Sequence, residues 1–114
     1  MDAVNRKFVI LDSLERVRNH YLLELDIRTH ELTELRAKIG GEVTPPEEVW
    51  TSIGFLAHKL AGTSATLGFQ DVGDAASILD EMLPSGSELK AERSEIVKSI
   101  DELLSQMMAA QVTR

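Results

Sequence analysis

The chain of 114 residues suits one domain, and 43% of its residues are hydrophobic, so a core can form without covalent staples. It has no cysteine, which excludes disulfides, thiol chemistry and zinc–thiolate sites. A formal charge of −7 without a basic stripe argues against nucleic acid, and no apolar run approaches the roughly 20 residues of a membrane span. We therefore expect a soluble, cytoplasmic protein with a single domain, residues 1–114.

The first expected helix covers about residues 3–39, which contain no proline or glycine. Its apolar residues recur at helical spacing, namely Val4, Phe8, Leu11, Leu14, Val17, Tyr21, Leu25, Leu32 and Leu35. The segment is longer than an ordinary globular helix, so it forms either one long helix or two, with a break near Asp12 or Arg18. Gly40 and Gly41 are placed to end it.

The second expected helix runs from about Pro46 to Leu67. Thr44 is a suitable N-cap with Glu47 at capping-box spacing, and Gly68 is placed to end the helix in a turn. At about 100° per residue, one face of this helix becomes the expected core face. That face holds Trp50, Ile53, Leu56, Ala57, Leu60, Ser64 and Leu67.

A third helix is expected over about residues 71–82, and a fourth over about 88–110 with Ser87 as its cap. The expected inward residues are Val72, Ala75, Ala76, Leu79 and Leu83, followed by Leu89, Ile96, Ile100, Leu103, Leu104 and Met107. Short loops make consecutive helices antiparallel neighbours. The sequence thus predicts an all-α fold, an antiparallel up-down four-helix bundle with an additional N-terminal helical segment.

His58 is the candidate functional residue, because it lies beside the core face of its helix among mostly small neighbours. Those neighbours are Thr51, Gly54, Phe55, Ala61, Gly62 and Ala65. Gly54 and Gly62 each cost about 1 kcal/mol of helix propensity relative to alanine. We interpret them as clearance that lets another protein approach the imidazole. The alternative is a solvated or core-edge histidine, with glycines that serve close helix packing.

The stretch "AHKLAGTSATLGF" resembles the motif of histidine-containing phosphotransfer (HPt) domains, roughly H-x-L-K-G, a run of small residues, then L-G. The matching residues are His58, Leu60, Gly62, Thr63, Ser64, Ala65, Leu67 and Gly68, and Leu79-Asp80 follows where the family often has Leu-Glu. The resemblance implies a four-helix bundle with an exposed active histidine midway along one helix. This histidine would accept a phosphoryl group from a receiver-domain aspartyl phosphate and pass it to another receiver aspartate.

The resemblance also implies the partners, which are response-regulator receiver domains, with a hybrid histidine kinase as a further candidate. It implies a monomer without ATP binding or a cofactor of its own, since Mg²⁺ belongs to the receiver. An imidazole is largely neutral near pH 7 and can act as a nucleophile without an activating base. The expected docking and clearance residues are Thr51, Gly54, Phe55, Lys59, Ala61, Gly62 and Ala65, and Gly68 forms the helix-ending turn.

One departure from the family leaves an alternative open. Ala61 stands where the family commonly has a lysine, and Lys59 lies about 100° away round the helix. The chain could therefore be a helical interaction module that binds signalling proteins without carrying phosphate. A di-iron carboxylate bundle is disfavoured, because the Glu-x-x-His motif is absent before all three histidines. The long N-terminal segment caps the bundle or supports dimerisation.

Overall fold

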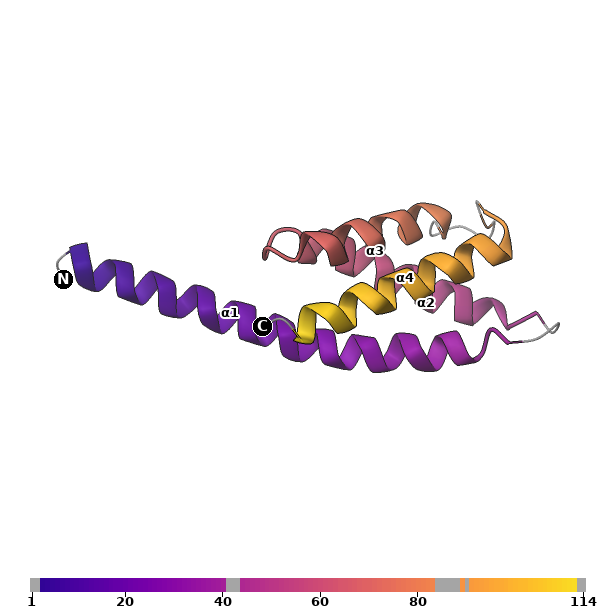
Figure 1. The fold of residues 1–114 in the computed structure, drawn as a ribbon, viewed down its shortest axis with the longest axis horizontal. Coiled ribbons are helices and arrows are strands. Elements are labelled where there is room, and N and C mark those ends of the chain that lie inside the picture. The colour runs from indigo at the N-terminus through magenta and orange to yellow at the C-terminus, as the bar shows by residue number, and fades with distance from the viewer. Residues whose placement is uncertain (1–2, 41–43, 84–88, 90, 113–114) are drawn as a thin grey trace.

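The computed structural model describes residues 3–40, 44–83, 89 and 91–112. These residues form α1 (Ala3–Ala37), α2 (Glu47–Ser64), α3 (Gln70–Met82) and α4 (Arg93–Val112), and the described part of the chain contains no strand. Figure 1 shows the four helices running alternately up and down, with α2, α3 and α4 gathered along the C-terminal half of α1. The predicted all-α bundle is confirmed.

The first helix is one continuous helix of 35 residues, so there is no break near Asp12 or Arg18. It ends at Ala37, and bonds from the Lys38 and Ile39 N–H groups to the carbonyls three residues earlier tighten its last turn. Gly40 does not adopt the left-handed conformation of a glycine cap, and Gly41 lies outside the described residues.

The N-terminal half of α1 projects beyond the bundle (Figure 1). Leu11, Leu14 and Val17 belong to the predicted apolar repeat, but they are exposed, because the other helices cover α1 only from about Tyr21 onward. The side chains of Val4 and Phe8 lie outside the described part of the structure. Helical spacing identified the apolar face of α1, but it did not show how far along α1 the other helices pack against that face.

The core follows the predicted faces in the other three helices. Every predicted core residue of α2 is buried except Leu67, which is half-buried. The buried residues of α3 and α4 are Val72, Gly73, Ala75, Ala76, Leu79, Ile96, Ile100, Leu103 and Met107, and Leu83 is buried just after α3. Leu89 was expected to face inward but is exposed, because α4 begins at Arg93 and helical spacing does not extend back to it. The predicted cap Ser87 lies outside the described residues.

The start of α2 differs from the predicted capping box. The N-cap is Pro46 and makes no side-chain cap hydrogen bond, so the assignment of Thr44 is wrong. Proline restrains the residue before it to an extended conformation. The pair Pro45-Pro46 therefore delays the helix to Glu47, which joins Glu48 in an acidic first turn that suits the helix dipole.

The end of α2 is a Schellman turn. The helix stops at Ser64, three residues earlier than expected, and the next residues curl into the turn. The Gly68 N–H donates to the Ala65 carbonyl (3.1 Å) and the Phe69 N–H to the Ser64 carbonyl (2.8 Å). Gly68 has a φ of 89°, the only positive φ among the described residues, and a side chain there would be strained.

Contacts with α1 hold this turn in place. The Phe69 ring stacks on Tyr21 with centroids 4.6 Å apart, and the Arg18 guanidinium lies over the Phe69 ring, 5.0 Å from its centroid. The Tyr21 hydroxyl is hydrogen-bonded to the buried Ser64 hydroxyl. The direction in which α3 leaves the turn is thereby fixed relative to α2.

Candidate functional site

His58 lies on the outer surface of α2, beside its core face. Its neighbours Ala57 and Leu60 point into the core and are buried, whereas the imidazole is 78% exposed. The Nδ1 atom lies 3.1 Å from Oδ2 of Asp80, which is 30% exposed on α3. The imidazole is thus open to solvent and held on one side.

The antiparallel packing of α2 and α3 brings Asp80 to His58. The adjacent Leu79 is fully buried, which leaves Asp80 at the edge of α3 that faces α2. Sequence reasoning noted Asp80 only as part of the family resemblance and missed this contact across 22 positions. The available signal was an acidic residue next to a core leucine on the neighbouring antiparallel helix.

The hydrogen bond determines which ring nitrogen is available for chemistry. An ionised carboxylate only accepts hydrogen bonds, so the tautomer of His58 that makes this contact keeps its proton on Nδ1 and donates a hydrogen bond to Asp80. In the neutral ring the lone pair then resides on Nε2, on the opposite side of the imidazole. The arrangement presents a nucleophilic Nε2 whose ring is oriented by a carboxylate.

The two glycines flanking His58 have different roles. A Cβ atom on Gly62 would meet nothing within 4 Å, so this position is open surface. A Cβ on Gly54 would lie 2.8 Å from the Leu83 carbonyl oxygen, and Gly54 is buried. The clearance interpretation is therefore wrong for Gly54, which allows the chain after α3 to pack closely on α2.

Five of the remaining site residues share one side of α2. Thr51, Phe55, His58, Gly62 and Ala65 fall within about 80° of one another on the helix. Phe55 is 75% exposed, and the others are also exposed. This side of α2 offers an apolar ring and small residues next to the imidazole.

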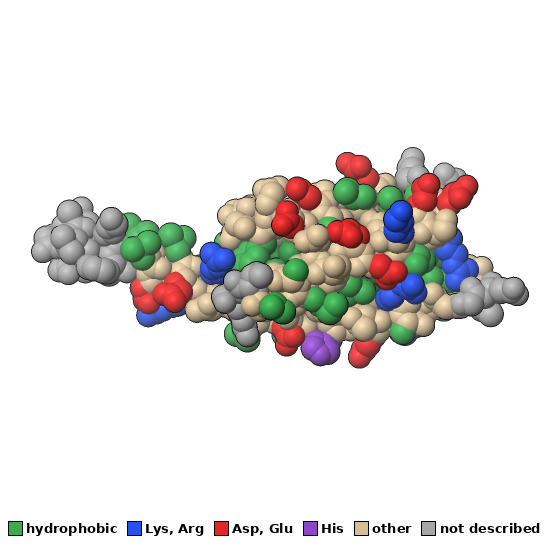
Figure 2. All heavy atoms as spheres, viewed as in Figure 1, with side chains coloured by type: hydrophobic (Ala, Val, Ile, Leu, Met, Phe, Trp, Pro, Cys, Tyr) green, Lys and Arg blue, Asp and Glu red, His purple; other side chains and the backbone are tan. Residues whose placement is uncertain are grey.

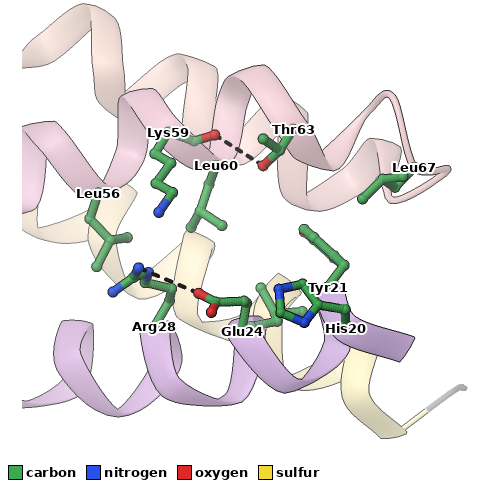
Figure 3. A pocket seen from close by; sticks show the side chains of 10 residues that line it. His20, Tyr21, Glu24, Arg28, Leu56, Lys59, Leu60, Thr63 and Leu67 are labelled. Carbon is green, nitrogen blue, oxygen red and sulfur yellow. Dashed lines mark hydrogen bonds and ion pairs between the residues drawn. The ribbon is translucent and has the colours of Figure 1, made fainter. Parts of the chain in front are cut away.

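No lysine stands beside His58 at the position where the family motif has one, and Lys59 does not replace it. Ala61 is half-buried against the core, at the position where the family has its lysine. Lys59 lines a groove of about 350 Å³ between α1 and α2, and its side chain is directed into the groove (Figure 3). The groove is lined by His20, Tyr21, Glu24, Leu25, Arg28, Leu56, Lys59, Leu60, Thr63 and Leu67. Lys59 is thus a groove residue rather than a neighbour of the imidazole.

His30 is the other exposed histidine with a bound Nδ1 atom. That atom lies 2.9 Å from the carbonyl oxygen of Asp26, one turn earlier on α1, so this contact lies entirely within α1. Within the described residues, no three His, Cys, Asp or Glu side chains gather closely enough to hold a metal ion.

A family model described as Hpt domain matches residues 22–110. No significant match is found among curated proteins or among solved structures. Over the part of the chain that the structure describes, no helix combines the length and hydrophobicity needed to cross a membrane.

Proposed function

Because the chain belongs to the Hpt domain family, we propose that it is a phosphorelay intermediate in which His58 carries the phosphoryl group. The observation that supports this most directly is the exposed imidazole with Nδ1 held by Asp80. The family points to a role in histidine phosphotransfer, and the assignment to His58 is ours. The cytoplasmic location expected from the composition stays a prediction.

The proposed transfer uses the Nε2 lone pair as the nucleophile. It attacks the phosphorus of a receiver's aspartyl phosphate, so an N–P bond forms while the acyl O–P bond breaks. The receiver's aspartate leaves as a carboxylate, and the ring gains a positive charge. The Asp80 carboxylate stabilises that charge through the Nδ1–H bond. The reverse steps deliver the phosphoryl group to the aspartate of a second receiver.

The charge of the transferred group is neutralised mainly by the partner in this proposal. Phosphoryl transfer depends on positioning and on charge stabilisation. Ala61 supplies no cation, and Lys59 faces the groove. The receiver brings its own Mg²⁺, as the family resemblance implies, and the protein contributes a fixed nucleophile without a cofactor of its own.

The proposed docking surface is the side of α2 around His58. Phe55 supplies an exposed aromatic ring, and Gly62 supplies open space through which a receiver reaches the imidazole. Thr51 and Ala65 extend this surface along the helix, and Lys59 lies at its border with the groove. Gly54 is left out, because it is buried against Leu83.

The test is transfer from a receiver domain carrying labelled phosphate. We expect an acid-labile, alkali-stable label on the wild-type chain and none on His58→Gln. The matched control is His30→Gln, which removes an equally exposed histidine from α1 and should leave labelling unchanged. Label that persists on His58→Gln would overturn the assignment.

The second candidate is an interaction module that binds receivers without carrying phosphate. Ala61 favours it, because no lysine stands at that position to offset the phosphoryl charge. The same assay separates the two candidates. A wild-type chain that binds the receiver but takes no label would establish the interaction module.

A further inference from the structure

The groove between α1 and α2 has no part in the proposed phosphotransfer. Asp80 holds His58 on the side of α2 next to α3, whereas the groove lies on the side next to α1. Lys59 and Thr63, which line the groove, are about 100° and 140° from His58 round the helix. The imidazole can therefore react without the groove, and the groove is a separate surface with a chemistry of its own.

The floor of the groove is aliphatic. Leu25 of α1 and Leu56 and Leu60 of α2 line it and are otherwise buried in the core. On α1 the lining residues run from His20 to Arg28, about 12 Å along the helix. The volume of about 350 Å³ is at the lower end of the range for small-molecule sites. The groove has room for one extended chain, whereas an α-helix with its side chains is about 10 Å across.

The charge of the groove is opposite to that of the chain. The chain has a formal charge of −7, and acidic side chains are spread over the face of the bundle that Figure 2 shows. The groove is lined by the cations Arg28 and Lys59 and by one carboxylate, that of Glu24. The lining therefore favours an anionic ligand, although the chain as a whole repels anions.

Lys59 is the cation that is available to such a ligand. Arg28 already lies 3.4 Å from a carboxylate oxygen of Glu24 and 2.9 Å from one of Glu31. Within the described residues Lys59 makes no ion pair, and its side chain is directed into the groove (Figure 3). The Thr63 hydroxyl donates to the Lys59 carbonyl oxygen (3.0 Å), so its hydrogen is not free for a ligand. The ammonium is thus the polar anchor of the groove.

The polar anchor and the apolar lining are arranged end to end. Figure 3 shows Lys59 beside Leu56 at one end of the groove. Leu67 and Tyr21 lie at the other end, where His20 stands on the rim. A ligand that suits this order has an anionic head at one end and an unbranched apolar tail.

We propose that the groove binds a medium-chain alkyl carboxylate, such as octanoate. The carboxylate accepts a charge-assisted hydrogen bond from the Lys59 ammonium. The alkyl chain lies over Leu56 and Leu60 towards Leu67, where burial of its methylene groups contributes the remaining affinity. Acetate offers only the head and 1-octanol only the tail, so these two compounds separate the contributions.

Isothermal titration calorimetry of the whole chain with acetate, hexanoate and octanoate tests the tail. We expect saturable binding of one octanoate per chain. Full burial of a methylene group corresponds to about fourfold in affinity, and the groove is open on one side, so each added methylene should give about twofold. Acetate that binds as tightly as octanoate, or octanoate that does not saturate, would overturn the proposal.

The variant Lys59→Met tests the head, because methionine keeps most of the apolar stem and removes the charge. It should weaken octanoate binding about fivefold, as expected for a solvent-accessible ion pair. Binding of 1-octanol, which has the same tail without the charge, should be equal in the variant and the wild type. An equal loss of affinity for both ligands would show that Lys59 does not bind the carboxylate.

The variant Thr63→Phe tests the location, because Thr63 is an exposed wall residue of the groove. Its larger ring should fill the groove and reduce octanoate binding at least tenfold. The matched control is Thr66→Phe, since Thr66 is exposed just beyond α2 and does not line the groove. Circular dichroism verifies that each variant is folded. Unchanged octanoate binding by Thr63→Phe would place the ligand elsewhere and overturn the site, without affecting the phosphotransfer assay on His58.

Discussion

Asp80 on α3 accepts a hydrogen bond from Nδ1 of His58 on α2 at 3.1 Å, although 22 positions separate the two residues. The contact depends on the Schellman turn at Gly68, which sends α3 back along α2. It gives the exposed imidazole a defined orientation and a defined free nitrogen. The first prediction concerns this pair.

We expect Asp80→Asn to slow phosphoryl transfer about tenfold, equivalent to about 1.4 kcal/mol of barrier. The amide no longer stabilises the cationic ring, and it can also donate to Nδ1 and so favour the unsuitable tautomer. The measurement is the rate of label transfer from a phosphorylated receiver. The control is Asp74→Asn, since Asp74 is an exposed carboxylate of the same helix that pairs with Gln70. Equal rates for Asp80→Asn and wild type would remove Asp80 from the mechanism.

The second prediction restores the positive charge of the family motif. Ala61→Lys should raise the transfer rate and the lifetime of the phosphohistidine severalfold, because a charge-assisted hydrogen bond to the phosphoryl group is stronger than a neutral one. Ala61 is half-buried, and the lysine stem can follow the helix surface while its ammonium stays in water. Ala61→Met, of similar length but uncharged, controls for the added bulk. A gain shared by both variants would show that charge is not its cause.

The third prediction separates the two glycines of α2. Gly54→Ala should destabilise the fold by about 1–3 kcal/mol, because its Cβ would lie 2.8 Å from the Leu83 carbonyl oxygen. Gly62→Ala should stabilise it by up to about 1 kcal/mol, because this open helical position has no contact to lose. Urea unfolding followed by the fluorescence of Trp50, the single tryptophan, measures both. Shifts of the same sign would contradict the assigned roles.

Gly62 also allows the docking surface to be tested. Gly62→Leu should preserve the fold and reduce transfer at least tenfold, because the side chain would fill the open space beside His58. Gly62→Ala, much smaller, should retain most of the transfer. Normal transfer by Gly62→Leu would show that clearance at this position is not needed.

The last prediction concerns alkaline pH. Burial raises the pKa of Tyr21 above its ordinary value of 10.0, and the hydrogen bond with Ser64 offsets part of this rise. Below pH 10 the phenol is neutral in both the folded and the unfolded chain, so its full contribution to stability is present. As pH rises from about 10 through the folded pKa, the unfolded state ionises first and the free energy of unfolding falls.

Tyr21 is the single tyrosine, so its absorbance near 295 nm reports this ionisation alone. We expect a midpoint above 10 in the folded chain and an ordinary midpoint in denaturant. Tyr21→Phe should be less stable near neutral pH, because the buried Ser64 hydroxyl loses its partner, and should lack this alkaline decline. A folded midpoint below that in denaturant would contradict the effect of burial.

Much of the fold follows from local periodicity. The 3.6-residue repeat identified the helical segments and the core face of α2, because side-chain direction along a helix depends only on position in the chain. The features that periodicity misplaced are the ends of helices and the extent to which neighbouring helices cover an apolar face. Thr44 is not the cap, Leu89 precedes its helix, and Leu14 and Val17 have no cover. Each of these depends on where a neighbouring element begins or stops.

The sequence by itself determined that His58 stands on the outer surface of a helix beside a core face, since about 100° of rotation per residue requires it. Only the tertiary structure decided that Asp80 binds Nδ1, that Gly54 packs against Leu83, and that Lys59 turns into the groove. These contacts are set by distances between helices, and the distances follow from the packing of the whole core.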